Sequence, residues 1–213
     1  MKQLQKIVML CATLVLTACA ATRPPLPEVK IPPERISQNG YSLMPLNENG
    51  WMVVGRNAYE FALAKPGENP DETFAIQAIL SKVGTFNTTE DFVRLIKEGQ
   101  VNDTNPPRFK LLKHDVTPFP KTGIDCVKSH MITEDNAAVK RSGGTAEMIL
   151  EAVTLSCAHP NEKSVAIHVI YSHRHYPGKD DPAFMEKGTA VLNSVELFEP
   201  DQPYITQEVK AKN

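Results

Sequence analysis

Four segments in the second half of the chain carry the apolar, β-branched and aromatic residues that favour strands. They are Phe109–Val116, Gly123–Thr133, Ala146–Ala158 and Ser164–His173. Turn-forming residues separate them, and strands that follow one another in this way usually lie side by side. The pattern therefore predicts one antiparallel sheet.

More strands are predicted earlier in the chain. Tyr41–Leu46 and Trp51–Arg56 flank an Asn49-Gly50 pair, which favours a hairpin because both residues tolerate positive φ. Tyr59–Lys65 places Tyr59, Phe61 and Leu63 at alternate positions, on one face of a strand. Trp51 is the only tryptophan, and three apolar residues follow it, so we expect it in the core rather than exposed to a partner.

The segment Thr73–Val83 is compatible with a strand or a helix. Pro70 before it and Gly84 after it are typical of helix ends, whereas its β-branched residues favour a strand. We prefer the strand.

Two helices are predicted. Thr88 or Thr89 caps the first, acidic residues in its first turn complement the helix dipole, and Gly99 would end it. Its apolar stripe is Phe92, Val93, Leu95 and Ile96. The second begins near Asp181-Pro182, and its buried face would comprise Phe184, Val191, Leu192 and Val195.

These elements predict an α+β domain, in which an internal helix and a C-terminal helix pack on an antiparallel sheet. The order of strands and helices resembles the Mog1/PsbP-like α/β/α sandwich. That group contains accessory and binding proteins more often than enzymes. The resemblance implies a binding role only as an expectation, because fold does not determine function.

The first eighteen residues have the organisation of a signal peptide. Lys2 and Lys6 precede an apolar run, Ile7–Leu16, and two small residues follow. A run of this length gives roughly 15 Å of helix, about half the thickness of a hydrocarbon core. We therefore expect the segment to be removed rather than to span the membrane.

The sequence Leu16-Thr17-Ala18-Cys19 resembles the lipobox of bacterial lipoproteins. The resemblance implies cleavage before Cys19, a diacylglycerol on its thiol and a further acyl chain, such as palmitate, on its amine. Several acyl chains anchor a protein stably to a membrane. Ala20, in place of the aspartate that favours inner-membrane retention, implies a periplasm-facing anchor in the outer membrane.

Prolines are dense after the lipobox and favour an extended conformation, so we predict a tether over residues 19–35. Residues 36–200 would form a single α+β domain, and residues 201–213 a C-terminal tail. The formal net charge is −2, and no basic run occurs. This composition argues against nucleic acid as a partner.

Two cysteines remain outside the signal segment, Cys126 and Cys157. If their strands form a hairpin that turns at Arg141–Gly144, the two thiols lie almost opposite each other. Cross-strand neighbours are close enough for a disulfide, which persists outside the cytoplasm. A free catalytic or metal-binding thiol is the alternative, but no C-x-x-C spacing supports it.

The segment His168–His175 contains the densest group of chemically versatile side chains. In an extended strand Tyr171, His173 and His175 point to one side. His168, Ser172 and Arg174 then point to the other. We consider His173 and His175 as metal ligands, with a third ligand from His114, His130 or His159. Alternatively, a cleft lined by Arg174, His130 and Tyr171 would bind an anionic ligand.

Sequence motifs for catalysis are missing: there is no G-x-S-x-G, no H-E-x-x-H and no glycine-rich phosphate loop. We therefore expect a non-enzymatic, lipid-anchored module that binds an envelope protein or a cell-wall component and needs no cofactor. A purely structural lipoprotein would differ only in its partner. The other alternative is a metal- or anion-binding protein, or an enzyme, that uses the strand containing His168, His173, Arg174 and His175.

Overall fold

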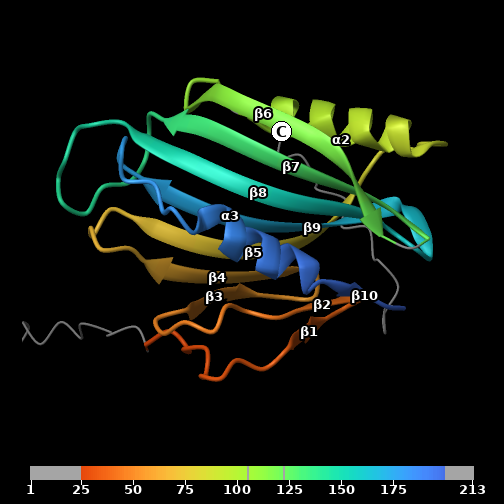
Figure 1. The fold of residues 1–213 in the computed structure, drawn as a ribbon, viewed down its shortest axis with the longest axis horizontal. Helices are drawn as coiled ribbons and strands as arrows, with labels where there is room; N and C mark the ends of the chain where they lie inside the picture. The colour runs from red at the N-terminus through yellow and green to blue at the C-terminus, as the bar shows by residue number, and fades with distance from the viewer. Residues whose placement is uncertain (1–24, 105, 122, 200–213) are drawn as a thin grey trace, which may run out of the picture.

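The computed structural model describes residues 25–104, 106–121 and 123–199. The largest element of the fold is a seven-stranded antiparallel sheet of order β3-β4-β5-β9-β8-β7-β6 (Figure 1). Its strands are β3 (Met52–Arg56), β4 (Glu60–Pro66), β5 (Thr73–Lys82), β6 (Phe109–Lys121), β7 (Ile124–Asp135), β8 (Met148–His159) and β9 (Glu162–His175). A smaller sheet, of order β1-β2-β10, contains Ile36–Gln38, Tyr41–Leu43 and Glu196–Leu197. The α+β class is confirmed.

The helices α2 (Thr89–Asp103) and α3 (Phe184–Asn193) pack on opposite faces of the large sheet. Figure 1 shows α3 across the front of the central strands and α2 at the β6–β7 edge. Side chains alternate along β9, so Tyr171 contacts α3, whereas His168 and Ile170 lie on the side of α2. We call these two surfaces the α3 face and the α2 face.

The main core lies on the α3 face and between the two sheets. Trp51 is fully buried in it, as its apolar neighbours predicted. Other fully buried members are Tyr41, Phe61, Leu63, Ile76, Tyr171 and Phe184. A second, smaller cluster under α2 contains Phe92, Ile96 and Val127. The core therefore has one layer on each side of the sheet.

The ambiguous segment Thr73–Val83 is a strand through Lys82, which confirms the preferred alternative. It pairs with β9 over its whole length, from Thr73 opposite Arg174 to Lys82 opposite Val165. A central strand with two neighbours satisfies all its backbone groups, and this outweighs the helix-end signals on either side.

The hairpin predicted between Tyr41–Leu46 and Trp51–Arg56 is wrong. The first segment supplies β2 of the small sheet, whereas β3 pairs with β4 in the large one. A different Asn-Gly pair, Asn39-Gly40, makes a two-residue turn between β1 and β2, with Gln38 opposite Tyr41 and a φ of 87° at Gly40. The later Gly50 also has positive φ but connects the two sheets instead.

Helix α2 begins as predicted, because the Thr88 side chain accepts a hydrogen bond from the Asp91 backbone N–H at 3.1 Å. It does not end at Gly99 but continues to Asp103, where the Thr104 hydroxyl donates to the Gln100 carbonyl. Side-chain contacts of Gln100 with the sheet hold this last part of the helix in place. Tertiary contacts thus outweigh the weak helix propensity of glycine.

Helix α3 begins close to its predicted start: Asp181 Oδ1 accepts a hydrogen bond from the Ala183 backbone N–H. Its buried residues are Phe184, Gly188, Val191 and Leu192, whereas Val195 lies beyond its end, in the core.

Strands β7 and β8 form the predicted hairpin, with Cys126 directly opposite Cys157. The two cysteines are joined by a disulfide, and their Cα atoms lie 4.1 Å apart. The bond therefore connects neighbouring strands inside the main core.

Part of the predicted tether belongs to the domain. The Val29 backbone N–H donates to the Trp51 carbonyl, and the Val53 N–H donates to the Pro27 carbonyl, each at 2.8 Å. The chain from Pro27 therefore lies along the outer edge of β3, so this part of the tether predicted over residues 19–35 packs against the domain. The signal segment, Cys19 and the tail at 201–213 lie outside the described residues.

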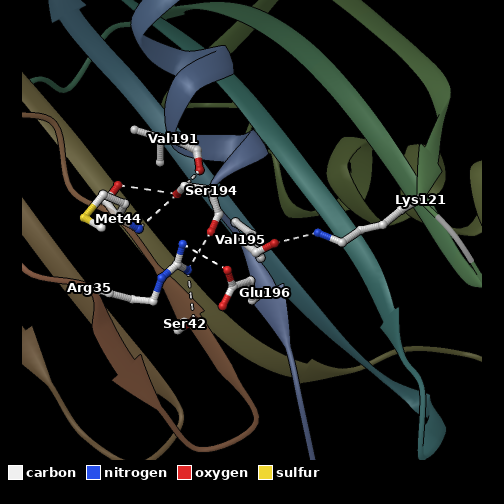
Figure 2. Close-up of polar contacts among 8 residues, drawn as sticks. All are labelled: Arg35, Ser42, Met44, Lys121, Val191, Ser194, Val195 and Glu196. Carbon is white, nitrogen blue, oxygen red and sulfur yellow. Dashed lines mark hydrogen bonds and ion pairs between the residues drawn. The ribbon is translucent and has the colours of Figure 1, made fainter.

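Arg35 fixes the same segment to the end of α3 (Figure 2). Its guanidinium donates to the Ser194 carbonyl at 2.8 Å and forms an ion pair with Glu196 at 3.1 Å. From the other side, Lys121 Nζ donates to the Val195 carbonyl at 2.6 Å. Cations at a helix C-terminus complement its dipole, so Arg35, just before β1, and Lys121, at the end of β6, stabilise the end of α3.

Candidate functional site

A groove lies between α2 and the α2 face of the sheet. Its volume is about 650 Å³, within the range of about 300–1,000 Å³ typical of small-molecule sites. Apolar side chains from α2 and four strands line most of it: Ile79, Leu95, Met131, Leu150, Ala152 and Ile170. Polar residues also line the groove: Gln77, Ser81, Lys82, Gln100, Asp103, Thr104, Thr133, Thr154, His168 and Ser172.

The groove exists because α2 covers only part of its face. The helix packs against β6 and β7, whereas the groove reaches β5 and β9 in the middle of the sheet. Small side chains such as Ala152 and Ser172 form its floor. The segment between β5 and α2 closes one side of the groove, because Gly84 packs against Leu95 of α2. The approach is close: a Cβ on Gly84 would lie 2.9 Å from Leu95 Cδ1.

His168 is the polar centre of the floor. Its Nε2 lies 2.9 Å from Ser81 Oγ and its Nδ1 lies 2.9 Å from Ser156 Oγ, so neighbouring strands hold both ring nitrogens. A hydroxyl donates or accepts, and the two serines therefore satisfy a neutral imidazole in either tautomer. Burial lowers the pKa of His168 to about 4, and the carboxylate of Asp103 only partly opposes this shift.

A depressed histidine pKa makes stability depend on pH. Between the ordinary pKa of 6.5 and about 4, unfolded His168 binds a proton that the folded state excludes, so the free energy of unfolding falls as the pH is lowered. In His168→Gln, the free energy of unfolding should fall less steeply as the pH is lowered. The reason is that the unfolded variant binds up to about one proton fewer than the unfolded wild type. Urea unfolding at pH 7, 6 and 5 measures the difference; parallel curves for the variant and the wild type would contradict the assignment.

Gln100 holds the last turns of α2 above the groove. Its Nε2 donates to Ser129 Oγ at 2.9 Å, and its Oε1 lies 2.8 Å from His114 Nε2. Burial lowers the pKa of His114, which favours the neutral ring as donor to this amide oxygen. The two bonds attach the helix to β7 and β6 and so fix the distance between the end of α2 and the sheet.

Two arginines and one carboxylate occupy the end of the α2 face. Asp135 is completely buried, and Arg108 reaches both its oxygens, Nε to Oδ1 at 3.1 Å and Nη2 to Oδ2 at 3.2 Å. Arg174 Nη2 lies 3.1 Å from Oδ2 of the same carboxylate. One negative charge is thus shared by two guanidinium groups, which sequence analysis did not connect because Arg108 and Asp135 carry no motif.

The cleft predicted from Arg174, His130 and Tyr171 is not assembled. Arg174 lies on the α2 face, whereas the other two lie on the α3 face, because side chains alternate along each strand. Tyr171 is buried against Phe184, with ring centroids 5.1 Å apart. His130 Nε2 lies 2.6 Å from Glu151 Oε1. Of the three residues, only Arg174 lies on the face of the sheet that carries the groove.

His173 and His175 lie side by side on the α3 face, as the alternation predicted, with ring centroids 4.5 Å apart. His173 also stacks on Phe74 at 4.0 Å, and burial lowers its pKa to about 4. Within residues 25–104, 106–121 and 123–199, no group of three histidine, cysteine or acidic side chains could hold a metal ion. The pair therefore packs as aromatic rings, without the third ligand that a metal site needs.

The fold has a distant likeness among solved structures. No protein-family model matches the chain, and no curated protein matches it. Among solved structures, it is similar to LpqN of Mycobacterium tuberculosis, described as involved in cell envelope biogenesis. The TM-score is 0.45 and the identity 10%, over 76% of this chain and 88% of LpqN. In the described part of the chain, no helix is long and apolar enough to cross a membrane.

Proposed function

We propose that this protein is a lipid-anchored envelope lipoprotein whose domain binds a small amphipathic molecule without chemically changing it. The groove between α2 and the sheet carries the proposal. A half-open, mainly apolar cavity with a few convergent polar groups is the usual form of a small-molecule site. The lipobox at Cys19 supports the anchor, and the outer membrane is the location that Ala20 favours.

Filling the groove should abolish binding. Ala152 lies on the floor, and Ala152→Phe would place an aromatic ring in the cavity. The neutral, apolar fluorophore N-phenyl-1-naphthylamine should bind the full-length wild-type protein with increased emission. We expect Ala152→Phe to weaken this binding at least tenfold, as measured by fluorescence titration.

Two further variants support the interpretation of this result. Gly99→Phe obstructs the same groove from α2, where a Cβ on Gly99 meets nothing within 4 Å. Val139→Phe adds the same ring to a loop residue that is 81% exposed, and should leave binding unchanged. If the fluorophore fails to bind the wild type, or binds all four proteins equally, the groove is not a binding site.

Lipidation is tested separately from binding. Mass spectrometry of the protein isolated from bacterial membranes should find Cys19 at the N-terminus, carrying a diacylglycerol and a further acyl chain. Cys19→Ser should release the protein from the membrane fraction. A native chain that begins at Met1, or a free thiol at position 19, would contradict the anchor while leaving the groove proposal intact.

A further inference from the structure

The Arg108–Asp135–Arg174 cluster lies at one end of the groove rather than apart from it. Arg174 is two residues beyond Ser172 on the same face of β9, and its cross-strand neighbour on β8 is Leu150; both of these residues line the groove. Arg108 places its guanidinium 4.7 Å from the ring centroid of Phe109, which also lines the groove. The cationic end and the apolar lining are therefore continuous.

The cluster has an excess of positive charge. Its side-chain exposed fractions are 41% for Arg108, 26% for Arg174 and 0% for Asp135, so the guanidinium groups reach solvent and the carboxylate does not. Within the described residues the buried Nε of Arg174 has no hydrogen-bond partner. Lys82 and Asp103, one charge of each sign, are the charged residues that line the groove itself. The arginine cluster carries two positive charges against one negative charge, and both positive side chains are partly exposed.

We propose that the groove binds a long-chain carboxylic acid, with its carboxylate against Arg174 and Arg108 and its hydrocarbon chain along the apolar lining. A guanidinium presents parallel N–H groups to a carboxylate, which makes it the preferred partner of this group. The hydrocarbon chain gains about 0.8 kcal/mol for each methylene removed from water. This inference rests on the proposed function, because it identifies the ligand of the same groove.

The experiment compares two ligands that differ only in the head group. Laurate and its neutral counterpart dodecanol, both below their aggregation concentrations, displace N-phenyl-1-naphthylamine from the full-length protein. We expect laurate to bind wild type at least tenfold more tightly than dodecanol. Arg174→Gln should weaken laurate at least tenfold and change dodecanol less than twofold.

Lys110→Gln is the matched control for net charge. Lys110 lies on the other face of the sheet, where it pairs with Glu134 at 3.4 Å, and its replacement should leave both ligands unchanged. Arg108→Gln, which leaves Arg174 paired with Asp135, should weaken laurate in the same direction. Thermal unfolding of each variant checks that it is folded.

The outcomes separate the two proposals. If neither laurate nor dodecanol displaces the fluorophore, the groove does not bind amphiphiles and the proposed function fails. If both displace it equally and the two arginine variants bind laurate like wild type, the groove binds amphiphiles but the carboxylate assignment is overturned. A selective loss of laurate affinity in both arginine variants supports the assignment.

Discussion

Replacing both cysteines, Cys126→Ala with Cys157→Ala, should lower the free energy of unfolding by about 3–4 kcal/mol. The disulfide joins residues separated by 31 positions, and a loop of this length restricts the unfolded chain by about that amount in the chain-entropy model. Both side chains are also buried in the main core, so truncation removes packing. The melting temperature should fall by roughly 10 °C.

Chemical reduction provides the control. A reducing agent should shift the wild-type unfolding curve towards that of the double variant and leave the variant itself unchanged. A double variant within about 1 kcal/mol of wild type would show that β7 and β8 are held by pairing and packing alone.

Gly188→Ala should destabilise the domain by about 1–3 kcal/mol, although alanine is the better helix former. Gly188 is buried where α3 crosses the sheet. A Cβ there would lie 2.4 Å from Val153 Cγ2 and 3.1 Å from Tyr171 Cδ1. Both side chains belong to the close-packed core, so α3 would have to move away from the strands. Urea unfolding of the full-length protein measures the change.

Gly99→Ala is the matched substitution in the other helix. A Cβ at Gly99 meets nothing within 4 Å, so only the helix propensity changes, and stability should rise by about 0.5–1 kcal/mol. Opposite signs for the two glycines are expected. If both variants were more stable than wild type, the close approach of α3 to the sheet would be refuted.

Six of the seven strands of the large sheet could be predicted because each carries a strong local signal, whereas the signals in Thr73–Val83 were compatible with a helix as well. The disulfide also followed from local information: the spacing of Cys126 and Cys157 around a glycine turn fixed their register. The order of the early strands could not be predicted, because Asn39-Gly40 and Asn49-Gly50 look alike in sequence. Only packing determines which pair closes a hairpin.

The groove could not be predicted for a related reason. Its lining combines residues far apart in sequence, such as Gln77, Leu95 and Ile170, and its volume depends on where α2 lies. One signal was available: small or polar residues at alternate positions of β8 and β9, including Ala152 and Ser172, indicate a face without a tightly packed helix. The sequence predicts an anion-binding role for Arg174, which stays a prediction, but it does not predict the contacts of Arg174 and Arg108 with Asp135.

The contact of Pro27 and Val29 with β3 also bears on self-association. An outermost strand offers a row of free backbone groups on which a second molecule could add a strand and start aggregation. Here the molecule's own leading segment occupies part of that row. At the opposite border β6 carries Pro118 and Pro120, which lack N–H donors. Neither border therefore offers an uninterrupted template for a second molecule.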